Sequence, residues 1–423
     1  MLLHQTTQGD NGGRPVLRKA AGVLWIVAAF LGGCAGSDGS TNAPLEKPLP
    51  LRIYSSPYAA VDWTADFRLR AQLHDHQGTT TGRIAAYDAA GYDVITLSDY
   101  SGNRTLPYAW TSRHWPAEAW LTPTFLASLR NIKILLPGAE EVGFPDTHIT
   151  SSFLDTYIER WTPDMGSAKQ SNQYETVQEM LSLIQSRGGI PCIAHPWNGL
   201  PAVSSDSPLC TEVYSAFAAY RTWQGTEAFF KTDRAAVLLS GWDTLLQRNQ
   251  SVIGVSVNDH FGPYSAIADL PDFIRDSGKI VVLSKAVTAP AFKEAFSRGA
   301  VFAIRDYGVT KNRYPLVNSI YTDETSIEID TTDRIEWVTG GALIGTGRRL
   351  ESTSIPQGSR YVRAEISNMD GSMIFTQAFR VRPVGDVDGD YDVDSQDQSI
   401  CWTIQSNTGN AFPAEQVAAC QSR

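Results

Sequence analysis

Between residues 51 and 305, short apolar runs alternate with amphipathic stretches, and a polar residue follows most of the runs. Residues 82–90 carry alanines at helical spacing, and Gly91 is placed to end that helix. The run at 92–97 combines branched and aromatic residues and is typical of a buried strand. Further strands are predicted near 131–136, 189–194, 211–217, 251–257 and 300–304, and helices near 174–186, 233–247 and 290–298. This alternation predicts an α/β domain over residues 51–311, with a parallel sheet closed into a barrel.

The pattern changes near residue 312, where apolar and polar residues begin to alternate with period two. Two such stretches, 327–341 and 359–381, contain turns rich in glycine, asparagine and aspartate. A period of two places alternate side chains on opposite faces of a strand. We therefore predict a small antiparallel β-sandwich over residues 312–383, followed by an acidic tail at 384–423.

The N-terminal segment has the pattern of an export signal. Basic residues Arg14, Arg18 and Lys19 precede an apolar stretch at 20–31 that is too short to span a bilayer. It ends in LGGC, which resembles a bacterial lipobox and implies cleavage before Cys34 and lipid attachment there. Residues 1–33 are then a lipoprotein signal peptide and 34–50 a linker, and the protein is an exported, membrane-anchored lipoprotein at the cell surface or in the periplasm. An ordinary signal peptide or an uncleaved anchor is the alternative.

Composition and charge narrow the class of partner. The chain has 423 residues, 42% of them hydrophobic, which suffices for more than one globular domain. A formal net charge of -10 argues against nucleic acid and is compatible with metal cations. Export implies an oxidising compartment, in which Cys401 and Cys420 are candidates for a disulfide. Cys192 is predicted to be a buried small hydrophobe, with a bridge to Cys210 as the alternative.

Histidines and carboxylates stand at or just beyond the ends of several predicted strands. His74 and His76, one residue apart, point to the same side if the strand continues through them. In a barrel of parallel strands the carboxyl ends meet at one face, where the active site is built. Imidazoles and carboxylates are ligands for Zn, Mn or Fe. Glu212 and Asp243 are predicted to be structural instead, as a strand-end acid and a helix N-cap.

Six stretches, in order, resemble the PHP family, named for polymerase and histidinol phosphatase domains. They are LHDH at 73–76, GYDVITLSD at 91–99, LPGAEE at 136–141, DTHI at 146–149, GGIPCIAHP at 188–196 and VNDHFG at 257–262. The resemblance implies a distorted (β/α)7 barrel with a multinuclear site of divalent metals. It also implies that these metals activate water to hydrolyse a phosphate ester. No GxSxG nucleophile elbow occurs in the chain.

The resemblance assigns roles to individual residues. It implies that the metal ligands are His74, His76, Glu140, His148, His195, Asp259 and His260. Glu141 is the alternative to Glu140, and Asn258 the alternative to Asp259. Asp99 and Tyr100 are placed at the catalytic centre, and Tyr100 stands where the family has a histidine. A phenol binds metal less readily than imidazole at neutral pH, so two firmly held metals are predicted. The alternative function is a catalytically degenerate PHP-like domain that serves as a cell-surface binding module.

The acidic tail contains a candidate calcium loop at 386–397. Acids occupy its first, third, fifth, seventh, ninth and twelfth positions, a spacing of oxygen ligands that Ca²⁺ favours; they are Asp386, Asp388, Asp390, Asp392, Asp394 and Asp397. The loop resembles a dockerin repeat, which implies a cohesin-like protein partner. A solvated acidic tail without bound calcium is the alternative.

Overall fold

The computed structural model describes residues 49–75, 81–96, 98, 121–136, 140–143, 148–154, 176–195, 210–216, 234–259, 277–306 and 313–408. Residues Pro48–Arg423 form one compact unit. None of the helices described is long and apolar enough to cross a membrane. The signal segment and Cys34 lie outside the described residues.

The N-terminal strands and helices follow the predicted positions closely. One group consists of β2 (Phe67–Gln72), α1 (Thr81–Ala89), β3 (Val94–Thr96), α2 (Pro123–Ser128), β4 (Ile134–Leu136), β10 (Gly278–Ser284), α8 (Ala289–Ser297) and β11 (Val301–Arg305). A second group consists of β5 (Glu140–Gly143), β6 (His148–Ser152), α3 (Val177–Ser186), β7 (Ile190–Ala194), β8 (Cys210–Ser215), α5 (Arg234–Gln247) and β9 (Ile253–Val257). The α/β class is confirmed by this order of elements.

The strand directions differ from the all-parallel expectation. The pairs β2–β3, β3–β4, β7–β8 and β8–β9 are parallel. The pairs β5–β6, β6–β7, β10–β11 and β10–β2 are antiparallel, so the sheets are mixed. Apolar runs buried on both faces look alike in either direction, which is why the sequence pattern did not distinguish them.

The two groups of strands meet at β9, which contacts β10 and β11. Gly278 begins β10 directly against Val257, the last residue of β9. A Cβ at Gly278 would stand 1.8 Å from the carbonyl oxygen of Val257, so any side chain here collides with backbone. This close approach holds the ends of β9 and β10 together, next to the residues that follow β9.

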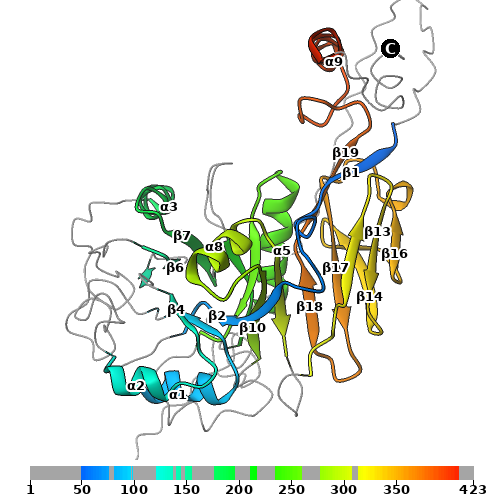
Figure 1. Ribbon diagram of the computed structural model, residues 1–423. Helices are drawn as coiled ribbons and strands as arrows, with labels where there is room; N and C mark the ends of the chain where they lie inside the picture. The colour runs from blue at the N-terminus through cyan, green and yellow to red at the C-terminus, as the bar shows by residue number, and fades with distance from the viewer. Residues whose placement is uncertain are drawn as a thin grey trace, which may run out of the picture. The chain divides into compact units, whose positions relative to one another are not determined.

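The C-terminal strands described are antiparallel and form two sheets, one of which continues into the α/β part (Figure 1). They are β12 (Ser319–Thr322), β13 (Ser326–Asp330), β14 (Arg334–Thr339), β15 (Ala342–Thr346), β16 (Arg349–Glu351), β17 (Tyr361–Ser367), β18 (Met373–Thr376) and β19 (Phe379–Pro383). β18 pairs with β11, and β19 pairs with β1 (Leu51–Ser55) near the start of the described chain. Buried side chains of the β12–β13–β16 sheet and of β14, β17 and β19 share one hydrophobic core.

A buried ion pair joins α5 to β17. Asp243 accepts hydrogen bonds from the Tyr361 hydroxyl at 2.6 Å and from Nε and Nη2 of Arg363 at 2.8 and 2.9 Å. Asp243 lies within α5 rather than at its start, so its prediction as an N-cap is wrong. Burial opposes the charge of Arg363, but the carboxylates of Asp243 and Glu365 outweigh burial and raise the pKa of Arg363.

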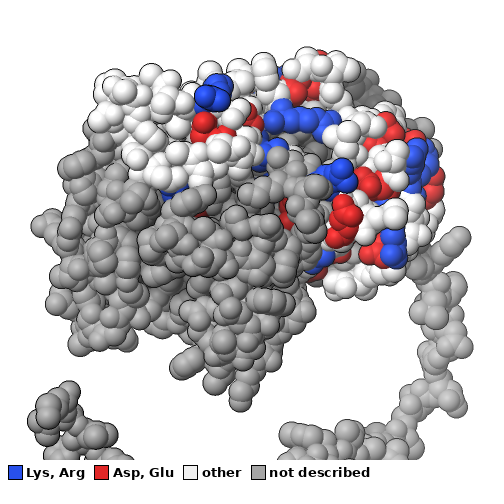
Figure 2. All heavy atoms as spheres, turned by 90° about the horizontal axis from the view of Figure 1, so that it is seen from below, with Lys and Arg blue, Asp and Glu red and all other residues white. Residues whose placement is uncertain are grey.

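On the face shown in Figure 2, acidic and basic side chains stand next to one another across the described surface. Pairs such as Arg334 with Glu336 and Arg349 with Glu351 are of this kind, with nitrogen–oxygen distances of 2.5 and 2.6 Å. Exposed pairs like these contribute little to stability.

Candidate metal centre

The centre is built around His74, which lies two residues beyond the end of β2 and has no exposed side-chain surface. Its Nε2 lies 3.3 Å from Oδ1 of Asp259, and its Nδ1 lies 2.6 Å from Oε1 of Glu212. The backbone N–H of Asp259 donates to the carbonyl oxygen of His74 at 2.9 Å. The ends of β2 and β9 are thereby tied together by both main chain and side chain.

His195 and Asp259 each stand just past a strand end with left-handed backbone. His195 follows β7 with φ of 27°, and Asp259 lies beyond β9 with φ of 51°. Nε2 of His195 lies 3.5 Å from Oδ2 of Asp259, and its ring stacks on that of His74 at 5.5 Å between centroids. Non-glycine residues rarely adopt positive φ, and those that do concentrate at functional sites.

The ligand atoms of His74, His195 and Asp259 all lie within 4.8 Å of one another, and all three residues are buried. Two imidazole nitrogens and a carboxylate oxygen that converge in this way fit a divalent transition metal. The donor set is also incomplete as a structural site, because such sites use four protein ligands. The three residues fit a metal that keeps positions for water, substrate or further ligands.

His148 lies at the edge of this group. It is the first residue of β6, and its side chain is buried. Its ring meets that of His195 edge to face at 4.8 Å. Glu140 begins β5, where its backbone alone is described. His76, Asp99, Tyr100 and His260 lie outside the described residues.

Asn258, the alternative ligand to Asp259, is used elsewhere. Its Nδ2 donates to the Tyr87 hydroxyl at 3.0 Å, and its Oδ1 accepts from the backbone N–H of Gly278 at 3.0 Å. Tyr87 donates to Asp75, which also accepts from Arg83 at 3.0 Å. This buried polar network joins Asn258, after β9, to α1 and to the start of β10. The carboxylate of Asp259 instead faces His74 and His195.

Comparison with known proteins adds little to this geometry. No known family profile and no curated protein matches the chain. A solved structure described as a two-domain protein containing predicted PHP-like metal-dependent phosphoesterase, from Bacteroides vulgatus ATCC 8482, is similar to it with a TM-score of 0.41 and 12% identity. That match covers 79% of this chain and 99% of the other.

Glu212 is the residue at this centre whose contribution was missed from sequence. It lies in β8 and is 1% exposed. Its Oε2 accepts the backbone N–H of His195 at 2.9 Å, while its Oε1 faces His74. An acid inside a predicted strand was the available signal, because a buried carboxylate requires a partner.

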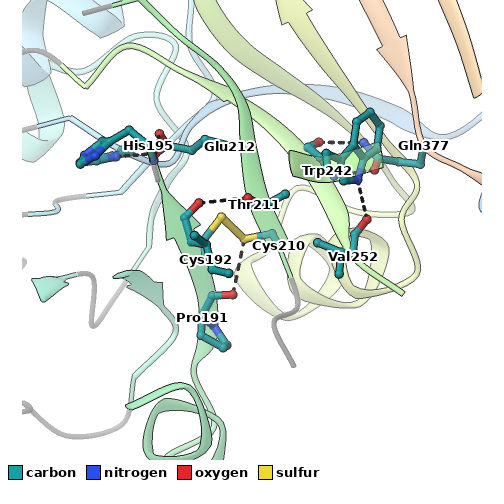
Figure 3. The surroundings of a disulfide bond; sticks show 12 residues. Pro191, Cys192, His195, Cys210, Thr211, Glu212, Trp242, Val252 and Gln377 are labelled. Atoms are coloured by element: carbon teal, nitrogen blue, oxygen red, sulfur yellow. Dashed lines mark hydrogen bonds and ion pairs between the residues drawn. A yellow bond between two sulfur atoms is a disulfide. The ribbon is translucent and has the colours of Figure 1, made fainter. Parts of the chain in front are cut away.

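A disulfide joins the two strands that hold His195 and Glu212 (Figure 3). Cys192 in β7 stands opposite Cys210 in β8, with 4.5 Å between their Cα atoms. The alternative considered from sequence, a Cys192–Cys210 bridge, is therefore the one observed. Cys401 is disulfide-bonded as well.

The acidic loop forms a separate group of candidate ligands before α9 (Ser395–Thr408). Its carboxylates gather in two sets, each with oxygens within 4.8 Å of one another: Asp386, Asp388 and Asp390, and then Asp392, Asp394 and Asp397. Burial raises the pKa of Asp386, and the neighbouring charge of Asp390 raises the pKa of Asp392. In both cases the environment disfavours the ionised carboxylate.

Proposed function

We propose that the protein is a metal-dependent hydrolase of phosphate esters with a PHP-type centre. The observation that supports this most directly is the convergence of His74, His195 and Asp259 at the ends of β2, β7 and β9. These are three of the positions at which the ordered PHP-like motifs place ligands. The distorted (β/α)7 barrel of that family is part of the same proposal.

A divalent transition metal bound by these residues would supply Lewis acidity and would lower the pKa of a bound water. The chain contributes the remaining conditions. His74 and His195 present nitrogens, Asp259 presents a carboxylate, and all three side chains are buried. We propose His76, Glu140, His148 and His260 as further ligands, sufficient for two metals, with Asp99 and Tyr100 beside the substrate. No protein nucleophile is required in this scheme.

We also propose that the chain is exported and anchored through lipid on Cys34, on the strength of the basic and apolar residues before it. Calcium is the proposed ligand of the acidic loop, supported by its ligand spacing and by the raised pKa values of Asp386 and Asp392. A cohesin-like partner is the corresponding proposal for the tail.

The test is metal content and turnover of the unit Pro48–Arg423, reconstituted with Zn²⁺ or Mn²⁺. We expect at least about one equivalent of metal and hydrolysis of bis(p-nitrophenyl) phosphate that chelators abolish. His195→Ala should lower both by at least about tenfold, because even partners outside the ligand shell contribute that much to metal affinity.

Asn249→Ala is the matched control, since Asn249 also has positive φ, of 62°, but follows α5 away from the centre. It should keep metal and turnover. If His195→Ala retains both, His195 is not a ligand. Firm metal binding without hydrolysis of any phosphate ester would favour the binding-module alternative.

A further inference from the structure

Glu212 is a buried carboxylate whose contacts are few and well defined. Its Oε1 lies 2.6 Å from Nδ1 of His74, and its Oε2 accepts the N–H of His195 at 2.9 Å. Among the residues that the structure describes, no lysine or arginine forms an ion pair with it. Burying a carboxylate without a cationic side chain beside it costs folding free energy, unless another positive charge or hydrogen-bond donor lies close to it.

His74 provides such a donor. A carboxylate can only accept a hydrogen bond, so the contact with Glu212 requires a proton on Nδ1 of His74, while Nε2 lies 3.3 Å from Oδ1 of Asp259. A metal at this centre would be bound through Nε2, which would place positive charge one imidazole ring away from Glu212. Histidine ligands with a carboxylate on the second nitrogen are a common arrangement in metal sites.

The second oxygen acts on His195 through the backbone. The N–H that it accepts belongs to a residue with φ of 27°, a conformation that local structure must hold in place. β8 is irregular directly after this point, with a register shift between Glu212 and Tyr214 against β9. Such a bulge redirects side chains, so the carboxylate is presented to both histidines from a specially shaped strand.

The Cys192–Cys210 disulfide keeps the two strands in this register (Figure 3). Cys210 lies two residues before Glu212, and Cys192 three residues before His195. The hydroxyl of Thr211 adds a bond of 3.4 Å to the carbonyl oxygen of Ile193. These two bonds restrict relative movement of β7 and β8 within three residues of Glu212 and His195.

We propose that Glu212 is a positioning residue that sets two metal ligands at once, the tautomer of His74 and the backbone of His195. The inference concerns the centre of the proposed function and rests on metal binding there, but not on the reaction. A glutamine cannot replace Glu212, because an amide offers one acceptor where two are needed. Either its NH₂ group faces Nδ1 of His74 and moves the proton to Nε2, or it opposes the N–H of His195.

The experiment compares Zn²⁺ affinity and the His74 tautomer in the parent and in Glu212→Gln. Chelator competition should show about a 10- to 100-fold loss of affinity, the range for partners of metal-binding histidines. In the metal-free proteins, ¹⁵N NMR of labelled histidine should place a proton on Nδ1 of His74 in the parent. In the variant, either that proton moves to Nε2 of His74 or the backbone ¹⁵N signal of His195 shifts. A purely structural role for Glu212 would not move that proton.

Asp243→Asn is the control, because it also replaces a buried, hydrogen-bonded carboxylate with an amide, but in the pair with Arg363. It should lower thermal stability and leave Zn²⁺ affinity within about twofold of the parent. Glu212→Gln with parental affinity and an unchanged tautomer would overturn the inference, as would a parent that binds no Zn²⁺. Loss of Zn²⁺ in Glu212→Gln with no phosphoesterase activity in the parent would leave the inference standing and refute the proposed reaction.

Discussion

Single carboxylates in this protein act by accepting several backbone or side-chain donors at once. Glu212 contacts two histidines, and Asp243 accepts hydrogen bonds from Arg363 and Tyr361. Asp88 in α1 accepts backbone hydrogen bonds from residues 130–132. Each is buried and fully hydrogen-bonded, which is the condition under which a polar group is stable inside a protein. Their positions tie together segments that are far apart in the sequence.

Asp88 leads to a prediction about acid stability. It accepts backbone N–H groups of Arg130, Asn131 and Ile132 at 2.7 to 3.0 Å. Burial favours the neutral acid, but these donors outweigh burial and hold the pKa of Asp88 below its ordinary value. The stability it contributes is therefore present above the unfolded pKa of about 3.9 and is lost as pH falls through the lower folded value.

We expect Asp88→Asn to lower the free energy of unfolding by about 1 to 3 kcal/mol at pH 7, since one acceptor oxygen becomes a donor facing N–H groups. Urea unfolding at pH 7 and near pH 3 measures this. The difference between the parent and variant should shrink at the lower pH. Asp370→Asn, at an exposed turn, is the control. Equal stability of Asp88→Asn and the parent at pH 7 would contradict the assignment.

Among the elements, β7 and β8 bear the most on the site. They are parallel neighbours, they share the disulfide, and they lead to His195 and Glu212. β9 completes this parallel set and leads to Asp259. His195 and Asp259 thus follow the carboxyl ends of two parallel strands, as in sheets whose strand ends are aligned, while Glu212 lies within the strand between them.

The disulfide should stabilise this set of strands measurably. It closes a loop with a sequence separation of 18, for which the chain-entropy estimate is about 3 kcal/mol. We expect Cys192→Ala/Cys210→Ala to unfold at a lower urea concentration than the oxidised parent, by about that free energy. Complete reduction of the parent with a dithiol should remove most of the difference. An oxidised parent no more stable than the double variant would show that the bridge is neutral.

For the molecule as a whole, the continuous sheet connects the metal centre to the C-terminal strands. β11 pairs with β18, β1 pairs with β19, and the Asp243–Arg363 pair adds a polar link. The acidic loop follows β19 directly, so a cation bound there would act on the same compact unit. We therefore expect a cation that stabilises the acidic loop also to raise the stability of the sheet against unfolding.

Calcium should therefore stabilise the protein in a pH-dependent manner. The pKa values of Asp386 and Asp392 are raised, so the ionised loop costs folded stability above those values, and protonation relieves that cost as pH falls. We expect roughly 1 mM Ca²⁺ to raise the melting temperature at pH 7 and to do so less as pH falls toward 4, where protons compete for the carboxylates.

Asp388→Asn/Asp390→Asn should remove most of this calcium effect and leave Zn²⁺ content of the histidine centre unchanged. Asp323→Asn is the matched control, because Asp323 likewise accepts several N–H and hydroxyl groups within its own loop. Scanning calorimetry with Ca²⁺ or Mg²⁺ gives the comparison. A melting temperature that does not respond to Ca²⁺ at pH 7 would support a solvated acidic tail.

Hydrophobic periodicity, a local signal, located most strands and helices from the sequence, and the resemblance of the strand-end motifs to the PHP family named His74, His195 and Asp259. The sequence also identified the acidic loop, whose ligands are contiguous. Tertiary structure decided the directions of β6, β10 and β11 and the continuation of one sheet through the β11–β18 pair. It also decided the Cys192–Cys210 bond and the contacts of Glu212 with the two histidines. Each depends on which segments become neighbours, and an isolated buried acid or cysteine carries no record in its local pattern of the partner that folding will bring to it.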